Sequence, residues 1–527
     1  MDPNRRSVKW LVAIPALFLA YFFVYPLASI LWVSLTTEGG RPWSEILANA
    51  RIGRVVWFSA WQATASTFLT MLFGLPVAWA FSRFAFPGRK VMRAALTIPF
   101  VMPTVVVAAA FLVLFGRSSP IPLVETVWII LIAHVFYNLA VVVRVVGGLW
   151  ESIDDRLVDA ARTMGASRLA AFRAVTLPIL RPALAAASAI VFLFSFTSFG
   201  VVLLLGGLRY STIEVAVWRR YFVLDLQGAA TLAIVQLVGV TVVLTVYARW
   251  QRRRQTQRSV RSERLPAPTG WRQRFLVFGI IGVALTAELG PLLTLVVRSF
   301  ATSDGYGLAN YAALANPDSA FLVPPATAIG NSMKFGLAAM VLAVLIGGLA
   351  SVVIASRRSS TWFDTLLMLP LGTSAVTIGF GFVVALDWPI DLRTSLILVP
   401  IAHALVAIPF VVRTTVPVLA SIRDHLREAA ATLGATPRQV LRKIDFPIAA
   451  KALAAGGGLA FAVSLGEFGA TSFIARPSTP TLPVAIFRFL ERPAETSFGR
   501  AMAMSTILML VTAVVIAAID GYRTGDL

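Results

Sequence analysis

Two short segments of this chain share one pattern of residue types and spacing. In each, an acidic residue precedes two alanines, a glycine is the sixth residue after the acid, and a proline is the nineteenth. The first copy consists of Asp159, Ala160, Ala161, Gly165 and Pro178, and the second, 269 residues later, of Glu428, Ala429, Ala430, Gly434 and Pro447. No nucleophile–base pair accompanies either copy. The pattern therefore suits non-covalent docking better than covalent catalysis.

The residue types of this repeated loop predict a short helix, a turn and a second short helix. Paired alanines let a helix face approach a partner closely, and we place the acid near the start of the first helix, where the helix dipole favours negative charge. The glycine permits a turn that a Cβ atom would hinder. The proline marks the entry to the next apolar segment, where a missing N–H is tolerated. A rigid helical loop of this kind can transmit force from a soluble partner protein to the membrane helices.

The composition places these loops in a membrane protein. Hydrophobic residues make up 58% of the chain and charged residues only 13%, and the mean hydropathy is +0.80. A soluble domain could not bury so much apolar surface. The chain has no Cys and three His, which excludes disulfides and thiolate catalysis and argues against a His-rich metal site. The net charge of +21 lies in short loops between apolar runs, so we assign it to membrane topology and expect no nucleic-acid partner.

Apolar runs of about 20 residues, the length that crosses a bilayer as a helix, recur along the whole chain. They predict an all-α, polytopic membrane protein with about twelve transmembrane helices. The first run is too long for a signal-peptide core and is taken as a first span. The expected spans are 10–35, 56–82, 94–116, 126–150, 182–207, 228–249, 275–298, 332–356, 364–386, 394–420, 451–475 and 499–520.

Lys and Arg clusters predict the orientation of these spans, because basic loops remain in the cytoplasm. The clusters are Arg5, Arg6 and Lys9; Arg83, Arg89, Lys90 and Arg93; and the stretch from Arg249 to Arg274. With the N-terminus inside, all three clusters, both motif loops and both termini are cytoplasmic. We therefore expect a multi-pass protein of the cell membrane.

The repeat extends far beyond the motif. Residues 134–219 align with 403–488 without a gap, and about a third of the positions are identical. The chain therefore consists of two homologous six-helix halves, residues 1–250 and 274–527, joined by a basic cytoplasmic linker at 251–273. An even number of spans gives both halves the same orientation, as in parallel repeats that enclose a pathway between them.

Polar residues inside the expected spans are candidates for that pathway. Glu467 is expected in the middle of span 451–475, and its counterpart in the first half is Ser198. Glu467 is either a pathway residue or a structural hydrogen-bond acceptor between helices. His134 and His403 occupy matched positions, and we expect them to be packing histidines with satisfied hydrogen bonds.

The repeated loop resembles the signature loop of the permease subunits of binding-protein-dependent ABC importers, which are type I, MetI-like permeases. The first copy departs from that pattern by Asp159 for Glu and Val175 for Ile, and the second by Phe446 for Leu. In this family the loop forms a coupling helix that docks on a separate ATPase. Fused double permeases of this size resemble thiamine and ferric-iron import systems, and segments such as HVFYNL at 134–139 and SLGEFGA at 464–470 are closer to the thiamine type.

The resemblance implies a transport subunit, not an enzyme. The chain has no phosphate-binding loop of the Walker type, so we expect it to bind no cofactor and ATP to be used by two copies of a partner subunit. An extracytoplasmic solute-binding protein would deliver the substrate, and the lipid bilayer is the remaining partner. Thiamine or a related cationic nutrient is the first candidate substrate. Ferric iron is the alternative, and an ion-driven secondary transporter is the alternative from another class.

The predicted topology can be tested by labelling single-cysteine variants, because the chain has no native Cys. A cysteine placed at Ser259, in the linker, should be protected from a membrane-impermeant thiol reagent in intact cells and become reactive after permeabilisation. Strong labelling of that cysteine in intact cells would contradict the topology.

Overall fold

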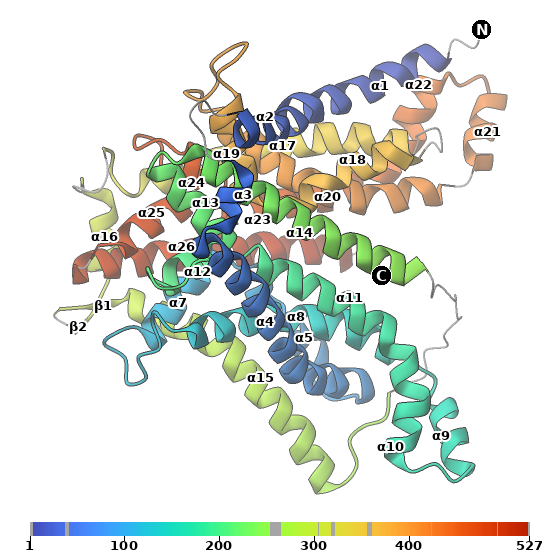
Figure 1. The fold of residues 1–527 in the computed structure, drawn as a ribbon. Helices are drawn as coiled ribbons and strands as arrows, with labels where there is room; N and C mark the ends of the chain where they lie inside the picture. The colour runs from blue at the N-terminus through green and yellow to red at the C-terminus, as the bar shows by residue number, and fades with distance from the viewer. Residues whose placement is uncertain are drawn as a thin grey trace.

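The computed structural model describes residues 4–36, 42–252, 265–303, 305–317, 322–355, 361–422, 424–492 and 494–524. Within these ranges the chain is almost entirely helical, and the only sheet is one antiparallel pair of two-residue strands, which confirms the all-α fold class. Figure 1 shows the helices running side by side as one elongated bundle.

The first half contains α1 to α14. Their bounds are α1 Asn4–Leu19, the π-helical turn η1 Ala20–Val24, α2 Tyr25–Thr36, α3 Trp43–Ala48, α4 Ala50–Arg83, α5 Arg89–Ala95, α6 Ile98–Val101, α7 Thr104–Phe115, α8 Val127–Glu151, α9 Asp155–Thr163, α10 Arg168–Ala171, the π-helical turn η2 Phe172–Thr176, α11 Leu177–Phe196, α12 Gly200–Leu205, α13 Ile213–Phe222 and α14 Leu226–Arg252.

The second half has a similar order of long helices. Its elements are α15 Gly270–Ser299, β1 Ala301–Thr302, β2 Gly305–Tyr306, α16 Ala309–Ala312, the 3-10 turn η3 Ala313–Ala315, α17 Thr327–Ala355, α18 Thr361–Gly372, α19 Ala375–Ala385, α20 Leu398–Ser421, α21 Asp424–Thr432, α22 Pro437–Val440, the π-helical turn η4 Leu441–Asp445, α23 Phe446–Gly466, α24 Thr471–Ile474, α25 Leu482–Leu490 and α26 Glu495–Thr524.

Ten helices in the described part of the chain are long and apolar enough to cross a membrane, or eleven if one bent pair counts as a span. The bent pair falls on the predicted span 94–116, where the helical segments on either side of Met102 and Pro103 meet at 99°. The predicted span 364–386 is likewise divided, into α18 and α19. The count of about twelve therefore treated two broken segments as straight helices.

Each break has a local cause. Pro103 has no N–H to donate to a helix. In the second half the Ser374 side chain accepts hydrogen bonds from the N–H groups of Val376 and Thr377, so α19 starts anew with its own N-cap. The residues on both sides of each break are apolar, so hydropathy averaged over about 20 residues does not reveal the break.

The first helices of each half also pack against the other half. The helices α1 and α2 contact α17 and α19 of the second half, while α2 also packs against α14 of its own half. The helix α15 contacts α7 and α4 of the first half and α26 of its own half. In Figure 1, α15 leans away from the remaining bundle toward one end. Each half is therefore completed by a helix of the other.

The linker predicted at 251–273 falls largely on residues 253–264, which lie outside the described residues, as do residues 1–3 and 525–527. The helix α14 ends at Arg252 and α15 begins at Gly270. The division into residues 1–250, 251–273 and 274–527 stays a prediction.

Candidate coupling loops and the interface between the halves

The two motif loops adopt the same backbone geometry. Gly165 and Gly434 both have positive φ, at +90° and +82°, in the left-handed region that favours glycine. Gly165 N–H donates to the carbonyl of Arg162 at 3.0 Å, and Gly434 N–H donates to that of Ala431 at 2.9 Å. The glycines therefore end the first short helix of each loop, as predicted.

The acidic residue of the motif is not near the helix start, so that prediction is wrong. The helix α9 begins at Asp155 and its N-cap is Asp154, whose side chain accepts from the N–H of Arg156 at 2.9 Å. Asp159 therefore lies in the middle of α9, and Glu428 lies in the middle of α21. Both side chains are exposed, where they are free to meet a partner.

The motif prolines lie at the entry to the next long helices, as predicted, although no break in the helix precedes them. Pro178 is the second residue of α11 and Pro447 the second residue of α23. Each helix is joined to the preceding short helix through a π-helical turn, η2 or η4, at equivalent positions. A proline cannot donate to the carbonyl four residues earlier, and the wider turn accommodates this loss.

Each alanine pair provides one exposed side chain. Ala160 and Ala429 are exposed, Ala161 is buried and Ala430 is half-buried. Around them each loop displays apolar residues at matched positions. Met164 is 83% exposed and its counterpart Leu433 is 88% exposed.

Salt bridges tie the end of α8 and the start of the first loop to arginines of α4 and α5. Glu151, at the end of α8, binds Arg89 at 2.8 Å and Arg93 at 3.0 Å, and Asp155 contacts Arg83. These arginines belong to the basic cluster at residues 83–93, which in the sequence predicts only the membrane orientation. The equivalent second loop uses a different pair, Arg427 with Asp445 at 2.9 Å.

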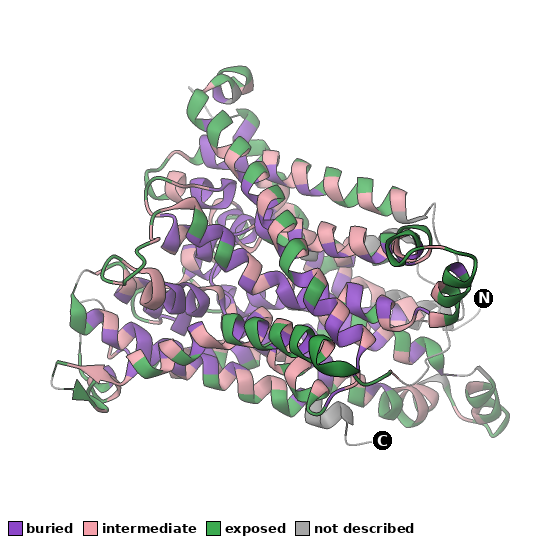
Figure 2. Ribbon diagram, turned by 90° about the horizontal axis from the view of Figure 1, so that it is seen from below, coloured by how far each residue is buried: buried purple, intermediate pink, exposed green. Residues whose placement is uncertain are grey.

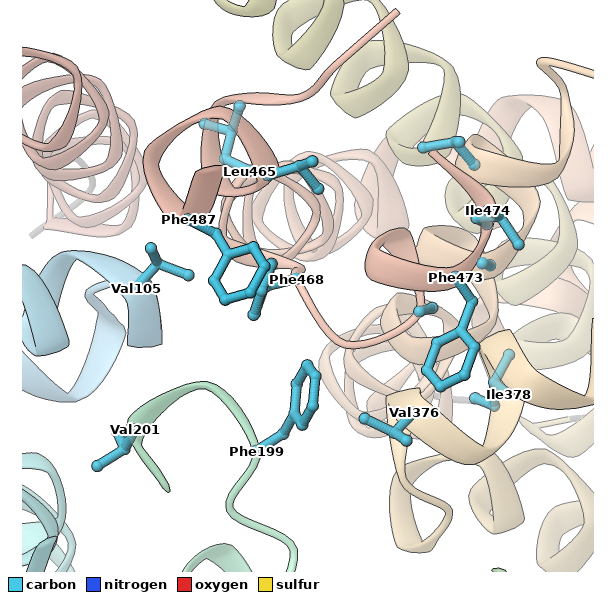
Figure 3. Packing of buried hydrophobic residues seen from close by; sticks show 14 of the residues in the cluster. Val105, Phe199, Val201, Val376, Ile378, Leu465, Phe468, Phe473, Ile474 and Phe487 are labelled. Atoms are coloured by element: carbon cyan, nitrogen blue, oxygen red, sulfur yellow. The ribbon is translucent and has the colours of Figure 1, made fainter. Parts of the chain in front are cut away.

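At the opposite end of the bundle the two halves meet through aromatic rings. Phe199 and Phe468 stack at a centroid distance of 5.3 Å, and Trp218 meets Phe487 edge-on at 5.9 Å. Each pair consists of residues 269 positions apart, so the rings are related by the repeat. Figure 3 shows Phe199, Phe468 and Phe487 facing one another between segments of both halves. Figure 2 shows buried residues gathered toward this end, away from the motif loops.

The histidines are packing residues, as predicted. His134 bridges Ser66 at 3.0 Å and Ser198 at 2.9 Å. His403 bridges Ser464 and Thr471, both at 2.7 Å. Every ring nitrogen of these two histidines therefore has a hydroxyl partner, and each ring connects its own helix to two other segments of the chain.

Glu467 is not in the middle of a helix, which corrects the predicted placement. The helix α23 ends at Gly466, and Glu467 is the first residue of a break before α24. Its carboxylate accepts from the N–H groups of Ala470 and Thr471 at 3.0 and 3.1 Å, and from the Thr471 hydroxyl at 2.8 Å. Ser198 occupies the matched break between α11 and α12. Both residues contact the histidine of their half, at 2.9 Å for Ser198 and 3.4 Å for Glu467.

Two buried carboxyl groups were missed. Glu214 accepts from Ser374 of the other half and from Gln236, both at 2.5 Å. Glu288, in the middle of α15, is 2% exposed. A lone acidic residue within an apolar run was the available signal, and Glu288 stands inside the predicted span 275–298.

Comparisons with known proteins agree with this architecture. The sequence profile of the family described as "Binding-protein-dependent transport system inner membrane component" matches residues 70–257 and 282–522, one match in each half. The thiamine transport system permease protein of Brucella abortus is 28% identical over 495 residues, covering 89% of this chain and 88% of its own. That of Salmonella typhimurium is 27% identical over 497 residues, covering 89% of each chain.

A ferric transport system permease protein of Actinobacillus pleuropneumoniae is 24% identical over 552 residues, covering 97% of this chain and 77% of its own. The resemblance to fused importer permeases is thereby confirmed. With a family match in each half and a helical bundle built as a repeat, the chain belongs to the inner-membrane components of binding-protein-dependent transport systems.

Proposed function

We propose that this chain forms the whole transmembrane pathway of an ABC importer and couples it to two copies of a separate ATPase. The observation that carries the proposal is the pair of motif loops with the same glycine-terminated geometry at one end of the bundle (Figure 1). One loop per half offers one docking site per ATPase copy. An ion-driven secondary transporter needs no docking loops for an ATPase.

The exposed apolar side chains on the loops support docking. Leu157 and Met164 in the first half, and Leu426 and Leu433 in the second, are exposed at matched positions. Apolar side chains held at a polar membrane surface favour burial against a partner protein. The motif end is then cytoplasmic, and an extracytoplasmic binding protein would deliver substrate at the other end.

The pathway would run between the halves, along the axis that relates them. The loops stand far apart at their end of the bundle (Figure 1), whereas Phe199, Phe468, Trp218 and Phe487 meet at the opposite end. This arrangement corresponds to a state closed toward the outside. ATP-driven approach of the loops would separate the rings and open the pathway outward.

Thiamine or a related cationic nutrient is the proposed substrate, since relatives named for thiamine transport match across nearly the whole chain. Ferric iron is the second candidate, because a relative named for ferric transport also matches. Uptake by vesicles that contain the permease, its ATPase and its binding protein separates the two.

Replacing both motif glycines with valine should uncouple the ATPase from transport. A Cβ atom at Gly165 or Gly434 would meet open space, so the substitution strains only the left-handed backbone, by about 1–3 kcal/mol at each site. We expect the Gly165→Val, Gly434→Val variant to insert normally while uptake of labelled thiamine falls several-fold. Gly148→Val, also in open space but helical, is the matched control. Normal uptake by the double variant would show that these loops do not couple.

Removing the stacked rings should loosen the closed end. Aromatic pairs contribute about 0.5–1.5 kcal/mol beyond area burial, and destabilising the closed state shifts the population toward the outward-open one. Phe199→Ala with Phe468→Ala should therefore raise ATP hydrolysis in the absence of the binding protein. Phe68→Ala, on an exposed side chain of α4, should leave it unchanged. Equal hydrolysis in both variants would refute the proposed closure.

Glu467→Gln distinguishes a structural role from a role in guiding cations. The amide nitrogen of glutamine cannot accept hydrogen bonds from Thr471. Loss of these bonds at the start of α24 should lower the free energy of unfolding by about 1 kcal/mol. If Glu467 and Ser198 also line the pathway, thiamine uptake per folded complex falls as well. Glu45→Gln, at an exposed acid, is the control. A destabilised variant with unchanged uptake per folded complex would remove Glu467 from the pathway.

A further inference from the structure

A cavity of about 1010 Å³ lies between α15 and the first half, away from the interface of aromatic rings. Its walls come from α4, α7, α8 and α15 and are almost entirely apolar, with Phe73, Phe111, Trp128 and Phe275 among them. Phe73, Trp128 and Phe275 are exposed on the outer surface of the bundle. In a membrane such a surface faces lipid, so the cavity opens sideways into the bilayer.

One carboxyl group lines this apolar cavity. Glu288 is almost completely buried, and no donor among the described residues lies within hydrogen-bond distance of its Oε2 atom. Burying a carboxyl oxygen without a hydrogen-bond donor destabilises the folded protein. A bound ligand that donates a hydrogen bond to this oxygen would remove that cost. The cavity thus has apolar walls for an apolar body and one acceptor for a positively charged donor.

The repeat shows that the architecture does not require this acid. The segments Pro26 to Ser34 and Pro291 to Ser299 correspond in the first helices of the two halves. Three residues before the proline, the first half has Phe23, a buried apolar ring. A residue like Phe23 would pack in lipid at no such cost, so Glu288 is a departure specific to one half.

The depth of the carboxyl restricts the ligand. About eleven helical residues separate Glu288 from the end of α15 at Ser299, or roughly 16 Å at 1.5 Å per residue. This is about half of a 30 Å hydrocarbon core. The amine of a phospholipid headgroup remains at the interface and does not reach this depth. A membrane-soluble amine with a compact apolar body does.

We propose that this cavity is a lateral binding site for lipophilic amines, with Glu288 as the group that binds the ammonium. The ion pair forms from a carboxylate and an ammonium, or by proton transfer from the neutral carboxylic acid to a neutral amine that arrives through the lipid. Both routes give the same charges, and the apolar walls strengthen their attraction. The site is separate from the translocation pathway and does not depend on the substrate of the importer.

The test uses the full-length permease in lipid nanodiscs and two photoreactive probes. One is a diazirine-bearing adamantylamine, and the other is the corresponding adamantanol, which has the same compact apolar body without the charge. Labelled peptides are quantified by mass spectrometry. A hydrogen bond from a charged donor is stronger than one from a neutral donor, so we expect the amine to label α15 about tenfold more than the alcohol does, a difference of about 1.4 kcal/mol.

Glu288→Gln should bring the amine-to-alcohol ratio close to one while alcohol labelling persists. Gly279 lines the cavity and a Cβ atom there would meet open space, so Gly279→Phe should occupy part of the cavity and lower labelling by both probes. Gly282→Phe, also in open space on α15 but outside the cavity, should label like the wild type. Equal labelling of the wild type by the two probes, or an amine preference that survives Glu288→Gln, would overturn the proposal.

Discussion

Hydrocarbon offers no hydrogen bonds to a polypeptide backbone, so each interruption of a helix inside a bilayer must be satisfied by the protein itself. This requirement explains where the polar side chains of the bundle lie. Where α23 stops, the carboxylate of Glu467 accepts from the two N–H groups that open the next turn. Ser374 caps α19 in the same way, and its hydroxyl donates to Glu214 of the other half. The interruptions therefore coincide with the contacts that hold the two halves together.

The two halves keep a common frame and differ in the side chains placed on it. Each has a histidine that ties a span to the break in a neighbouring one, through Ser198 in the first half and near Glu467 in the second. Each presents an aromatic ring to its counterpart across the interface. The two halves therefore share one backbone arrangement. Side chains that differ between the halves make the chemical environment of the interface, and of the cavity beside α15, asymmetric.

Much of this structure follows from the sequence, and the failures have physical reasons. Span lengths, the repeat and the glycine turns are predictable because hydropathy and backbone conformation act locally. The broken spans are not, because the apolar composition continues across Pro103 and across residues 373–374. The position of Asp159 was misjudged because the cap is an earlier acid, Asp154. The partner of Glu214 lies in the other half, 160 residues away, and no local pattern indicates it.

The packing of the first helices on the other half bears on how the chain is made. Helices α1 and α2 are made before the rest of the described chain. The helix α2 packs partly on α14 of its own half, but one face of the pair packs on α17 and α19, which are made much later. Until residues beyond 327 have been inserted, those two helices have only lipid beside them on that face. The early half therefore remains unfinished during synthesis, and the late half completes it. Joining both halves in one polypeptide guarantees that the completing helices arrive in the same membrane, in equal number and after a fixed delay.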